Sequence, residues 1–299
     1  MRLAVAERTA PGRCRLLHRE RAITGLGEGL AQTGALAPAA LARTMLALQG
    51  FLATIRAYGV EVCQAVATQA VRQARNRQEV LRQLEETLGL PVRLLSTQEE
   101  ARFTLQGVLS VLNPKFLQNP NVMVFDVGGG SSEFALVRPQ QEPLLAGLPL
   151  GVLTLSQAHP LGDPPEPEAV ASLKETIAEQ LKIFYLDNFT PSLKAPPLLV
   201  GTAGAVTTLA AMALKMTEYD PDRVNNMILT RSQVEDLAAR LAALPEAERA
   251  RLPGLEAAKA GVMVAGALIV LTILEIFDRD SLVVSDAGLL EGVLQELAA

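Results

Sequence analysis

The sequence predicts a mixed α/β protein built from two domains. Its 299 residues exceed one typical domain of about 100–200 residues. Short apolar runs typical of strands alternate with segments of helical periodicity in both halves, which favours mixed sheets flanked by helices. Residues 113–121 contain two prolines and three asparagines, and they are predicted to form a linker. We therefore expect domain I at residues 1–115 and domain II at residues 120–285.

The elements of the first half follow from helical periodicity and from turn residues. Apolar side chains at Leu41, Met45, Leu48, Leu52 and Ile55 recur every three or four residues, which predicts one buried stripe on a helix. The expected order is strands 2–8 and 13–23 joined by a turn at Pro11-Gly12, a helix from Pro38 to Gly59, a strand at 60–67, helical sequence to Leu88, a strand at 91–95 and a helix at 97–112.

The second half repeats the alternation of strands and helices. The expected strands are 122–126, 133–138, 143–149, 197–201 and 282–285, and the expected helices are 167–187, 203–216, 231–242, 256–277 and 287–298. Residues 260–274 form an apolar run of 15 residues. A membrane-spanning helix needs about 20 residues, so this run is predicted to be a buried core helix.

Charge and scarce residue types exclude several classes of protein. The net charge is −5, and no basic run with interleaved aromatic residues occurs, so neither nucleic-acid nor membrane binding is expected. Cys14, Cys63, His18 and His159 show no metal-ligand or disulfide spacing. The N-terminal residues carry no apolar signal-peptide core. We expect a cytoplasmic protein whose chemistry depends on carboxylates, backbone amides and a hard metal ion.

A run of glycines follows the first predicted strand of the second half. The sequence VMVFDVGGGSSEFALV at 122–137 places Asp126 at the strand end, followed by three glycines and then Ser131, Ser132 and Glu133. Glycines let backbone N–H groups approach an anion, the serine hydroxyls would add donors, and Asp126 would hold hydrated Mg²⁺ beside a phosphate. The alternative interpretation is a plain glycine-rich turn between two strands.

Small residues form a second loop of this type, and two adjacent glutamates follow another strand. GTAGAVTTL at 201–209 leads from a strand into a helix, which indicates either a phosphate site at a helix N-terminus or close packing through small side chains. In STQEEAR at 96–102, the pairs Ser96/Glu99 and Thr97/Glu100 both have capping-box spacing. One glutamate is expected to cap the helix and the other to be available for acid–base chemistry, and spacing alone does not distinguish them.

Arginines gather at the start of a predicted helix. ATQAVRQARN at 67–76 carries Arg72 and Arg75, with Arg77 and Arg82 beyond, and only Glu79 offsets them locally. In an acidic chain such a cluster indicates either anion binding or a solvated helix face. Together with the two loops, it predicts a phosphoryl-handling site.

Six motifs span nearly the whole chain, and their order and the gaps between them match those of a known family: DVGGGSSE, STQEEAR, ATQAVRQARN, LPLGVLTL, VGTAGAVTTLAA and VSDAGLLEGVL. As a set they resemble the exopolyphosphatase / guanosine pentaphosphate phosphohydrolase family. The resemblance implies two actin-like (ribonuclease H-like) domains with mixed sheets and an interdomain cleft, and a C-terminal helix, 286–299, that packs back on domain I. It also implies Mg²⁺-dependent release of terminal phosphate from inorganic polyphosphate, guanosine pentaphosphate or both.

The resemblance assigns roles residue by residue. Glu100 would be the base that deprotonates the attacking water, and Asp126 and Glu133 would support catalysis and hold the metal. The residues implied to bind phosphate are Arg72, Gly128, Gly129, Gly130, Ser131, Gly201, Ala203, Gly204 and Lys259. In-line phosphoryl transfer needs positioning and charge neutralisation more than covalent chemistry, which is what such a residue set provides.

The chain also departs from the family pattern. Relatives begin with a strand and a glycine–serine loop of the type DxGSNS, whereas this sequence opens MRLAVAE. We therefore expect the native protein to begin upstream of Met1. Two other functions remain open: a non-catalytic protein that binds polyphosphate or an alarmone nucleotide such as guanosine tetraphosphate, and an ATP-using kinase of the same fold. A homodimer is an open alternative to a monomer.

Overall fold

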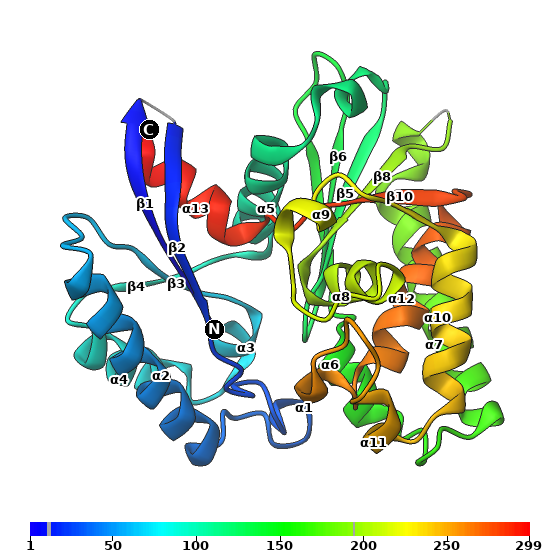
Figure 1. The fold of residues 1–299 in the computed structure, drawn as a ribbon, viewed down its shortest axis with the longest axis horizontal. Coiled ribbons are helices and arrows are strands. Elements are labelled where there is room, and N and C mark those ends of the chain that lie inside the picture. Colours follow the sequence, from blue (N-terminus) through cyan, green and yellow to red (C-terminus); the bar gives the residue numbers. More distant parts are fainter. Residues whose placement is uncertain (11–12, 194) are drawn as a thin grey trace. The chain divides into compact units, whose positions relative to one another are not determined.

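The computed structural model describes residues 1–10, 13–193 and 195–299, so the predicted turn at Pro11-Gly12 lies outside the described residues. The chain divides into two compact units (Figure 1). Unit 1 comprises Met1–Gly107 and Leu289–Ala299, and unit 2 comprises Val108–Gly288. The first crossing between them falls inside a helix, and the second falls just before the last helix.

The described residues of unit 1 form two separate two-stranded sheets, one antiparallel (β1 with β2) and one parallel (β3 with β4). Its core lies mainly between α2, α3 and α4, where Leu48, Phe51 and Val80 are buried. The elements are β1 (Arg2–Ala10), β2 (Arg13–Arg21), α1 (Leu30–Thr33), α2 (Pro38–Ala57), β3 (Ala65–Ala67), α3 (Gln69–Gln73), α4 (Arg77–Leu88), β4 (Val92–Leu94), α5 (Thr97–Val111) and α13 (Leu289–Ala298).

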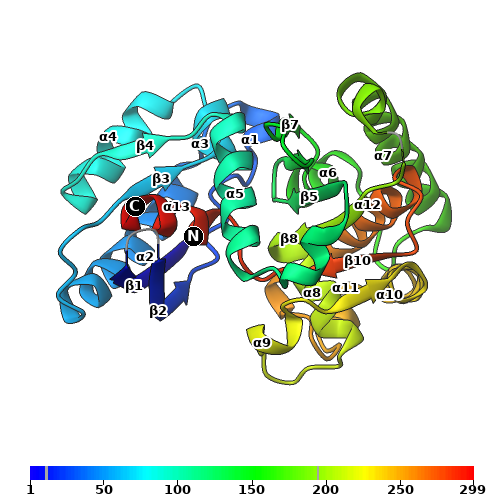
Figure 2. The ribbon, with the colours of Figure 1, turned by 90° about the horizontal axis from the view of Figure 1, so that it is seen from above.

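The C-terminal helix α13 belongs to unit 1 and lies against the β1–β2 hairpin, as Figure 2 also shows. Arg19 of the hairpin donates to Glu291 of this helix over 2.8 Å. Gly292 allows α13 to approach α5 closely, because a Cβ there would lie 1.9 Å from the Phe103 carbonyl oxygen. The last helix is thus seated directly on the helix that carries the two adjacent glutamates.

Two predictions for unit 1 need correction. The strand expected at 60–67 is only three residues long, Ala65–Ala67, because the preceding segment has no partner strand in the described structure and leaves Val62 65% exposed. The helical sequence to Leu88 is split into α3 and α4, because Ala74 takes an extended conformation with ψ 132°. The remaining expected elements of this unit appear within a few residues of their predicted bounds.

Unit 2 is built on a six-stranded mixed sheet of order β7-β6-β5-β8-β10-β9. The neighbours β5, β8 and β10 are parallel, and β6, β7 and β9 run antiparallel to their partners. The strands are β5 (Val122–Val127), β6 (Ser132–Val137), β7 (Leu144–Leu148), β8 (Leu198–Thr202), β9 (Ile228–Thr230) and β10 (Ser281–Val284). The helical elements are η1 (Pro114–Gln118), α6 (Val152–Ala158), α7 (Pro167–Asn188), η2 (Thr190–Ser192), α8 (Ala203–Ala213), α9 (Pro221–Val224), α10 (Arg231–Ala243), α11 (Glu246–Arg249), η3 (Ala257–Lys259) and α12 (Met263–Ile276).

The apolar run in unit 2 is a core helix, as predicted. Every residue from 263 to 274 in α12 is buried, which is the environment expected for a helix that is apolar all round. The helix predicted at 256–277 begins later, at Met263, because the short turn η3 and an irregular segment precede it. The sequence prediction missed α6, α9, α11 and β9, which are too short to show a clear periodicity.

One helix in the described part of the chain, α2, is long and apolar enough to cross a membrane by length and composition. A single helix of this kind is weak evidence, because core helices of soluble proteins pass the same test. One face of α2 packs into unit 1 through Leu41, Leu48 and Phe51. The expected absence of membrane binding stays a prediction.

Candidate functional site

The structure distinguishes the two adjacent glutamates at the start of α5. The helix begins at Thr97, so Ser96 occupies the N-cap position. The Glu99 backbone N–H donates to Ser96 Oγ over 3.2 Å, and the Ser96 N–H donates to Glu99 Oε2 over 2.9 Å. This is a complete capping box, so Glu99 caps the helix and the Thr97/Glu100 pair does not.

Strong partners surround the Glu99 carboxylate. Besides the Ser96 N–H, it accepts from the Ser96 hydroxyl over 2.9 Å and from Arg93 Nη2 over 2.6 Å. The Ser96 backbone hydrogen bond, followed by the Arg93 guanidinium, lowers the pKa of Glu99 to about 2. Glu99 is therefore a structural carboxylate that stays ionised at neutral pH.

Replacing Glu99 by glutamine is expected to destabilise the protein near pH 7 and to have little effect near pH 2. A carboxylate whose pKa is lowered on folding adds stability above its ordinary pKa near 4.5, and this contribution is lost as pH falls towards about 2. Urea unfolding of the two proteins at pH 7, 4 and 3 should show their free energies of unfolding converging. Glu175→Gln, an exposed glutamate on α7, is the control. A difference that is constant across this range would contradict the assignment.

Glu100, the other member of the pair, contacts Arg72. Arg72 Nη1 lies 3.3 Å from Glu100 Oε2 and donates to the Leu95 carbonyl over 2.6 Å. The Glu100 side chain is only 12% exposed and that of Arg72 is 23% exposed. Two candidate residues from separate motifs therefore meet in unit 1, and Arg72 is held against the protein by a backbone carbonyl.

Other arginines of the basic cluster have partners elsewhere in unit 1. Arg82 forms ion pairs with Glu79 and Glu86 on its own helix, at 2.6 Å each, and Arg75 donates to the Thr33 carbonyl. The solvated-face interpretation fits Arg82, which is 57% exposed at its side chain. Within this cluster, Arg72 is the residue placed beside Glu100.

In unit 2, the glycine loop between β5 and β6 is held by α6. The carbonyls of Gly128 and Gly129 accept from the N–H groups of Val152 and Leu153, over 3.0 and 2.7 Å. In a trans peptide the N–H points away from the carbonyl, so the N–H groups of Gly129 and Gly130 face away from α6. This is the orientation that an amide cradle for an anion requires.

Gly151 makes this arrangement sterically possible. It lies in the motif LPLGVLTL but was not among the predicted site residues. A Cβ at Gly151 would lie 2.4 Å from the backbone N and C of Gly130 and 2.5 Å from the C of Gly129. The α6 N-terminus can therefore touch the loop only through a glycine. The signal in the sequence was the isolated glycine directly before a short apolar segment.

Four polar side chains lie at the ends of the loop. Asp126 and Glu133 are directly opposite each other in the β5–β6 register, and Glu133 is 3% exposed. The Ser131 hydroxyl donates to Glu133 Oε1 over 2.6 Å, and the Ser132 hydroxyl donates to the Leu150 carbonyl over 2.7 Å. The serine hydroxyls were expected to donate to phosphate; in this structure both protons are used within the protein, which leaves Ser131 Oγ as an acceptor.

The donor set fits a hard divalent cation. Two carboxylates directly opposite each other on a sheet repel, and oxygen ligands are those that Mg²⁺ prefers. Among the described residues, no group of three or more His, Cys, Asp or Glu could hold a metal. Asp126 and Glu133 would thus supply only part of a coordination sphere, as is usual for Mg²⁺, which keeps several water ligands and binds substrate phosphates.

The second loop lies beside the first at the same edge of the sheet. In the parallel β5–β8 register, Asp126 is opposite Thr202 and Phe125 is opposite Gly201, so the carboxyl ends of the two strands are adjacent. Ala203, the first residue of α8, has a left-handed φ of 69°, which is uncommon for a residue with a side chain. The two small-residue loops are thus neighbours, as both predictions of a phosphate cradle require.

The packing interpretation of the second loop holds for Gly201, and the phosphate-site interpretation stays a prediction. A Cβ at Gly201 would lie 2.7 Å from the Phe125 ring, so Gly201 is required for packing. At Gly204, a Cβ would meet only Lys259, 3.9 Å from Nζ. Lys259 donates to Thr208 Oγ1 over 2.9 Å, and its side chain is 18% exposed. The structure therefore brings a cation to the N-terminal turn of α8.

Known proteins match almost the whole length of this chain. The model of the Ppx/GppA phosphatase family matches residues 5–299. Exopolyphosphatase 2 from Mycobacterium tuberculosis is 29% identical over 97% of this chain and 91% of its own length. The crystal structure of the Aquifex aeolicus Ppx/GppA family member is 32% identical and has a TM-score of 0.79, over 99% of this chain and 93% of that one.

A structure of an exopolyphosphatase from Cytophaga hutchinsonii, 22% identical with a TM-score of 0.88 over 99% of this chain and 94% of that one, adds support for the fold alone. The predicted fold class, mixed α/β with the actin-like ATPase fold, is confirmed. The family resemblance inferred from the motifs is also confirmed. The chain belongs to the Ppx/GppA phosphatase family and is a phosphoanhydride hydrolase of the exopolyphosphatase type.

Proposed function

We propose that this protein releases the terminal phosphate of inorganic polyphosphate, and also that of guanosine pentaphosphate, in a Mg²⁺-dependent reaction in the cytoplasm. The observation that carries the proposal is the pair of small-residue loops at the adjacent carboxyl ends of β5 and β8, beside the carboxylates Asp126 and Glu133. Relatives named exopolyphosphatases support polyphosphate as the substrate. Free Cys14 and Cys63 suit a reducing compartment.

In the proposed mechanism, each group has one task. The Gly129 amide of the 128–131 loop and the α8 N-terminus, with Lys259, bind phosphate oxygens. The Gly128 N–H donates to the Ser131 carbonyl over 2.9 Å and closes the loop. Arg72 neutralises charge on the transferred group, and Glu100 orients the attacking water and accepts its proton. Mg²⁺, held by Asp126 and Glu133, would supply charge neutralisation on the phosphates. Ser131 Oγ, whose proton is directed at Glu133, would accept a hydrogen bond from bound water.

Phosphate release from three substrates tests the proposal. Purified protein is incubated with long-chain polyphosphate, guanosine pentaphosphate or ATP, each with Mg²⁺ or with EDTA. We expect release from the first two substrates, with loss of activity in EDTA that added Mg²⁺ restores. Release from ATP alone, or activity that EDTA leaves unchanged, would overturn the proposed substrates or the proposed metal.

Replacing Lys259 by methionine is expected to raise KM for polyphosphate about tenfold at low salt, because hydrogen bonds to charged groups contribute about 1.5–3 kcal/mol. The methionine keeps the length of the side chain, so kcat should change less than KM. Steady-state phosphate release measures both constants. Lys182→Met, an exposed lysine on α7, is the control, and an unchanged KM in the Lys259 variant would remove this residue from the phosphate site.

A further inference from the structure

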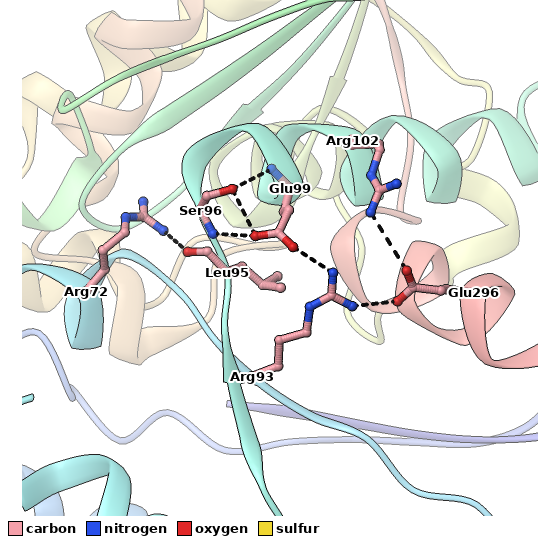
Figure 3. A network of polar contacts seen from close by, with 7 residues as sticks. All are labelled: Arg72, Arg93, Leu95, Ser96, Glu99, Arg102 and Glu296. Carbon is pink, nitrogen blue, oxygen red and sulfur yellow. Dashed lines mark hydrogen bonds and ion pairs between the residues drawn. The ribbon is translucent and has the colours of Figure 1, made fainter. Parts of the chain in front are cut away.

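A chain of side chains with alternating charges runs in unit 1 from the C-terminal helix α13 to the peptide before α5 (Figure 3). Glu296 of α13 accepts from Arg93 Nη1 over 2.9 Å, and Arg93 Nη2 donates to Glu99 Oε1 over 2.6 Å. Glu99 Oε2 then accepts from the Ser96 N–H over 2.9 Å. We call this chain, from Glu296 to the Leu95–Ser96 peptide, the relay.

The relay ends on the peptide that anchors Arg72. The Ser96 N–H and the Leu95 carbonyl belong to one planar peptide unit and point in opposite directions. Glu99 holds the N–H side, and Arg72 Nη1 donates to the carbonyl side over 2.6 Å. Rotation of this peptide would break both hydrogen bonds, so the orientation of the Arg72 guanidinium depends on Glu99.

Packing limits the freedom of the other end of the relay. The guanidinium of Arg93 lies 5.3 Å from the centroid of the Phe103 ring, and that of Arg102 lies 4.9 Å from it. Phe103 is fully buried, and Arg102 also pairs with Glu296 at 3.7 Å. The relay is therefore built on a fixed aromatic ring between α5 and α13.

We propose that Glu296 and Arg93 are positioning residues for the hydrolytic reaction, acting through Glu99 and the Leu95–Ser96 peptide on Arg72 and hence on Glu100, which lies 3.3 Å from Arg72. The proposal rests on the proposed function of Arg72 and Glu100. Arg93 and Glu296 are each 37% exposed at their side chains, and ion pairs with this exposure contribute little to stability. Their effect should therefore appear in kinetics more than in folding.

A double-mutant cycle tests the relay. Glu296→Gln removes the charge at its far end and keeps the shape of the side chain, and Arg72→Lys removes the anchored guanidinium. We expect Glu296→Gln to lower kcat/KM for polyphosphate roughly threefold or more in the wild-type background, and to have no effect in the Arg72→Lys background. Glu291→Gln, which breaks the α13 ion pair with Arg19 at 2.8 Å, is the matched control and should leave kcat/KM unchanged.

Amide hydrogen exchange of Ser96 provides a readout that does not require activity. Because Ser96 N–H donates to Glu99, we expect faster exchange at Ser96 in Glu296→Gln and no change at Val80, whose N–H donates to Asn76 over 3.1 Å in α4. Equal losses of kcat/KM in both Arg72 backgrounds, or unchanged exchange at Ser96, would overturn the relay. If the wild type releases no phosphate, the proposed function fails. Exchange at Ser96 still decides whether Glu296 influences the Leu95–Ser96 peptide.

Discussion

Replacing Glu100 by glutamine is expected to lower kcat for phosphate release by about 10²–10⁴-fold, the usual contribution of a positioned general base. The glutamine side chain has the same shape and can still accept a hydrogen bond from Arg72, but it cannot accept the proton of the attacking water. KM for polyphosphate should change little, because the amide loops that bind the phosphates are untouched. Steady-state phosphate release and thermal unfolding of both proteins measure these effects.

The neighbouring glutamate makes this substitution informative. Glu99 and Glu100 are adjacent in the first turn of α5, but Glu99 is committed to Ser96 and Arg93. We therefore expect Glu99→Gln to lower the free energy of unfolding more than Glu100→Gln does, and Glu100→Gln to lower kcat far more than Glu99→Gln does. If kcat is unchanged in Glu100→Gln, the base is another residue.

The capping box marks the limit of what spacing can predict here. Ser96/Glu99 and Thr97/Glu100 have the same separation, so the pattern predicts a helix start without choosing its register. The choice depends on where the backbone leaves β4, which has its last residue at Leu94, and on Arg93 being placed to reach Glu99. Both depend on tertiary contacts, so spacing could not show which glutamate caps the helix, and the role of Glu100 as the base stays a prediction from the family resemblance.

Buried strands and long helices could be predicted from sequence because their side chains repeat a simple pattern. The central strand β5 is Val122–Val127, against a prediction of 122–126, and α7 is Pro167–Asn188, against 167–187. The segment at 60–67 has the same apolar composition, but most of it lacks a neighbouring strand. Pairing of a strand depends on distant sequence, which a local pattern does not contain.

Side-chain hydrogen bonds within the site were also beyond sequence reasoning. Ser131 stays a predicted site residue, and the direction of its hydroxyl depends on Glu133, two residues later in β6. Residues two positions apart in an extended segment lie on the same face, but the sequence does not show which atom the hydroxyl proton will point to. The loop could be predicted as an anion cradle, but the hydrogen-bonding role of its serine could not.

Replacing Gly151 by alanine is expected to displace the 128–131 loop and to raise KM for polyphosphate at least tenfold. The new Cβ would lie 2.4 Å from backbone atoms of Gly130, a distance that backbone cannot tolerate without moving. Either α6 shifts or the loop rotates, and in both cases the hydrogen bonds from Val152 and Leu153 to the loop carbonyls are strained. Overpacking of this kind typically costs about 1–3 kcal/mol, so thermal unfolding should show a moderate loss and not a failure to fold.

Gly50→Ala is the matched control, because a Cβ at Gly50 would meet no atom within 4 Å on the exposed side of α2. Alanine in an exposed helix interior is favoured over glycine by about 0.5–1 kcal/mol, so this variant should be slightly more stable and equally active. An unchanged KM in Gly151→Ala would show that the loop binds substrate without support from α6. A raised KM with a small loss of stability would instead mean that the orientation of the loop amides, set through the carbonyls of Gly128 and Gly129, controls phosphate binding.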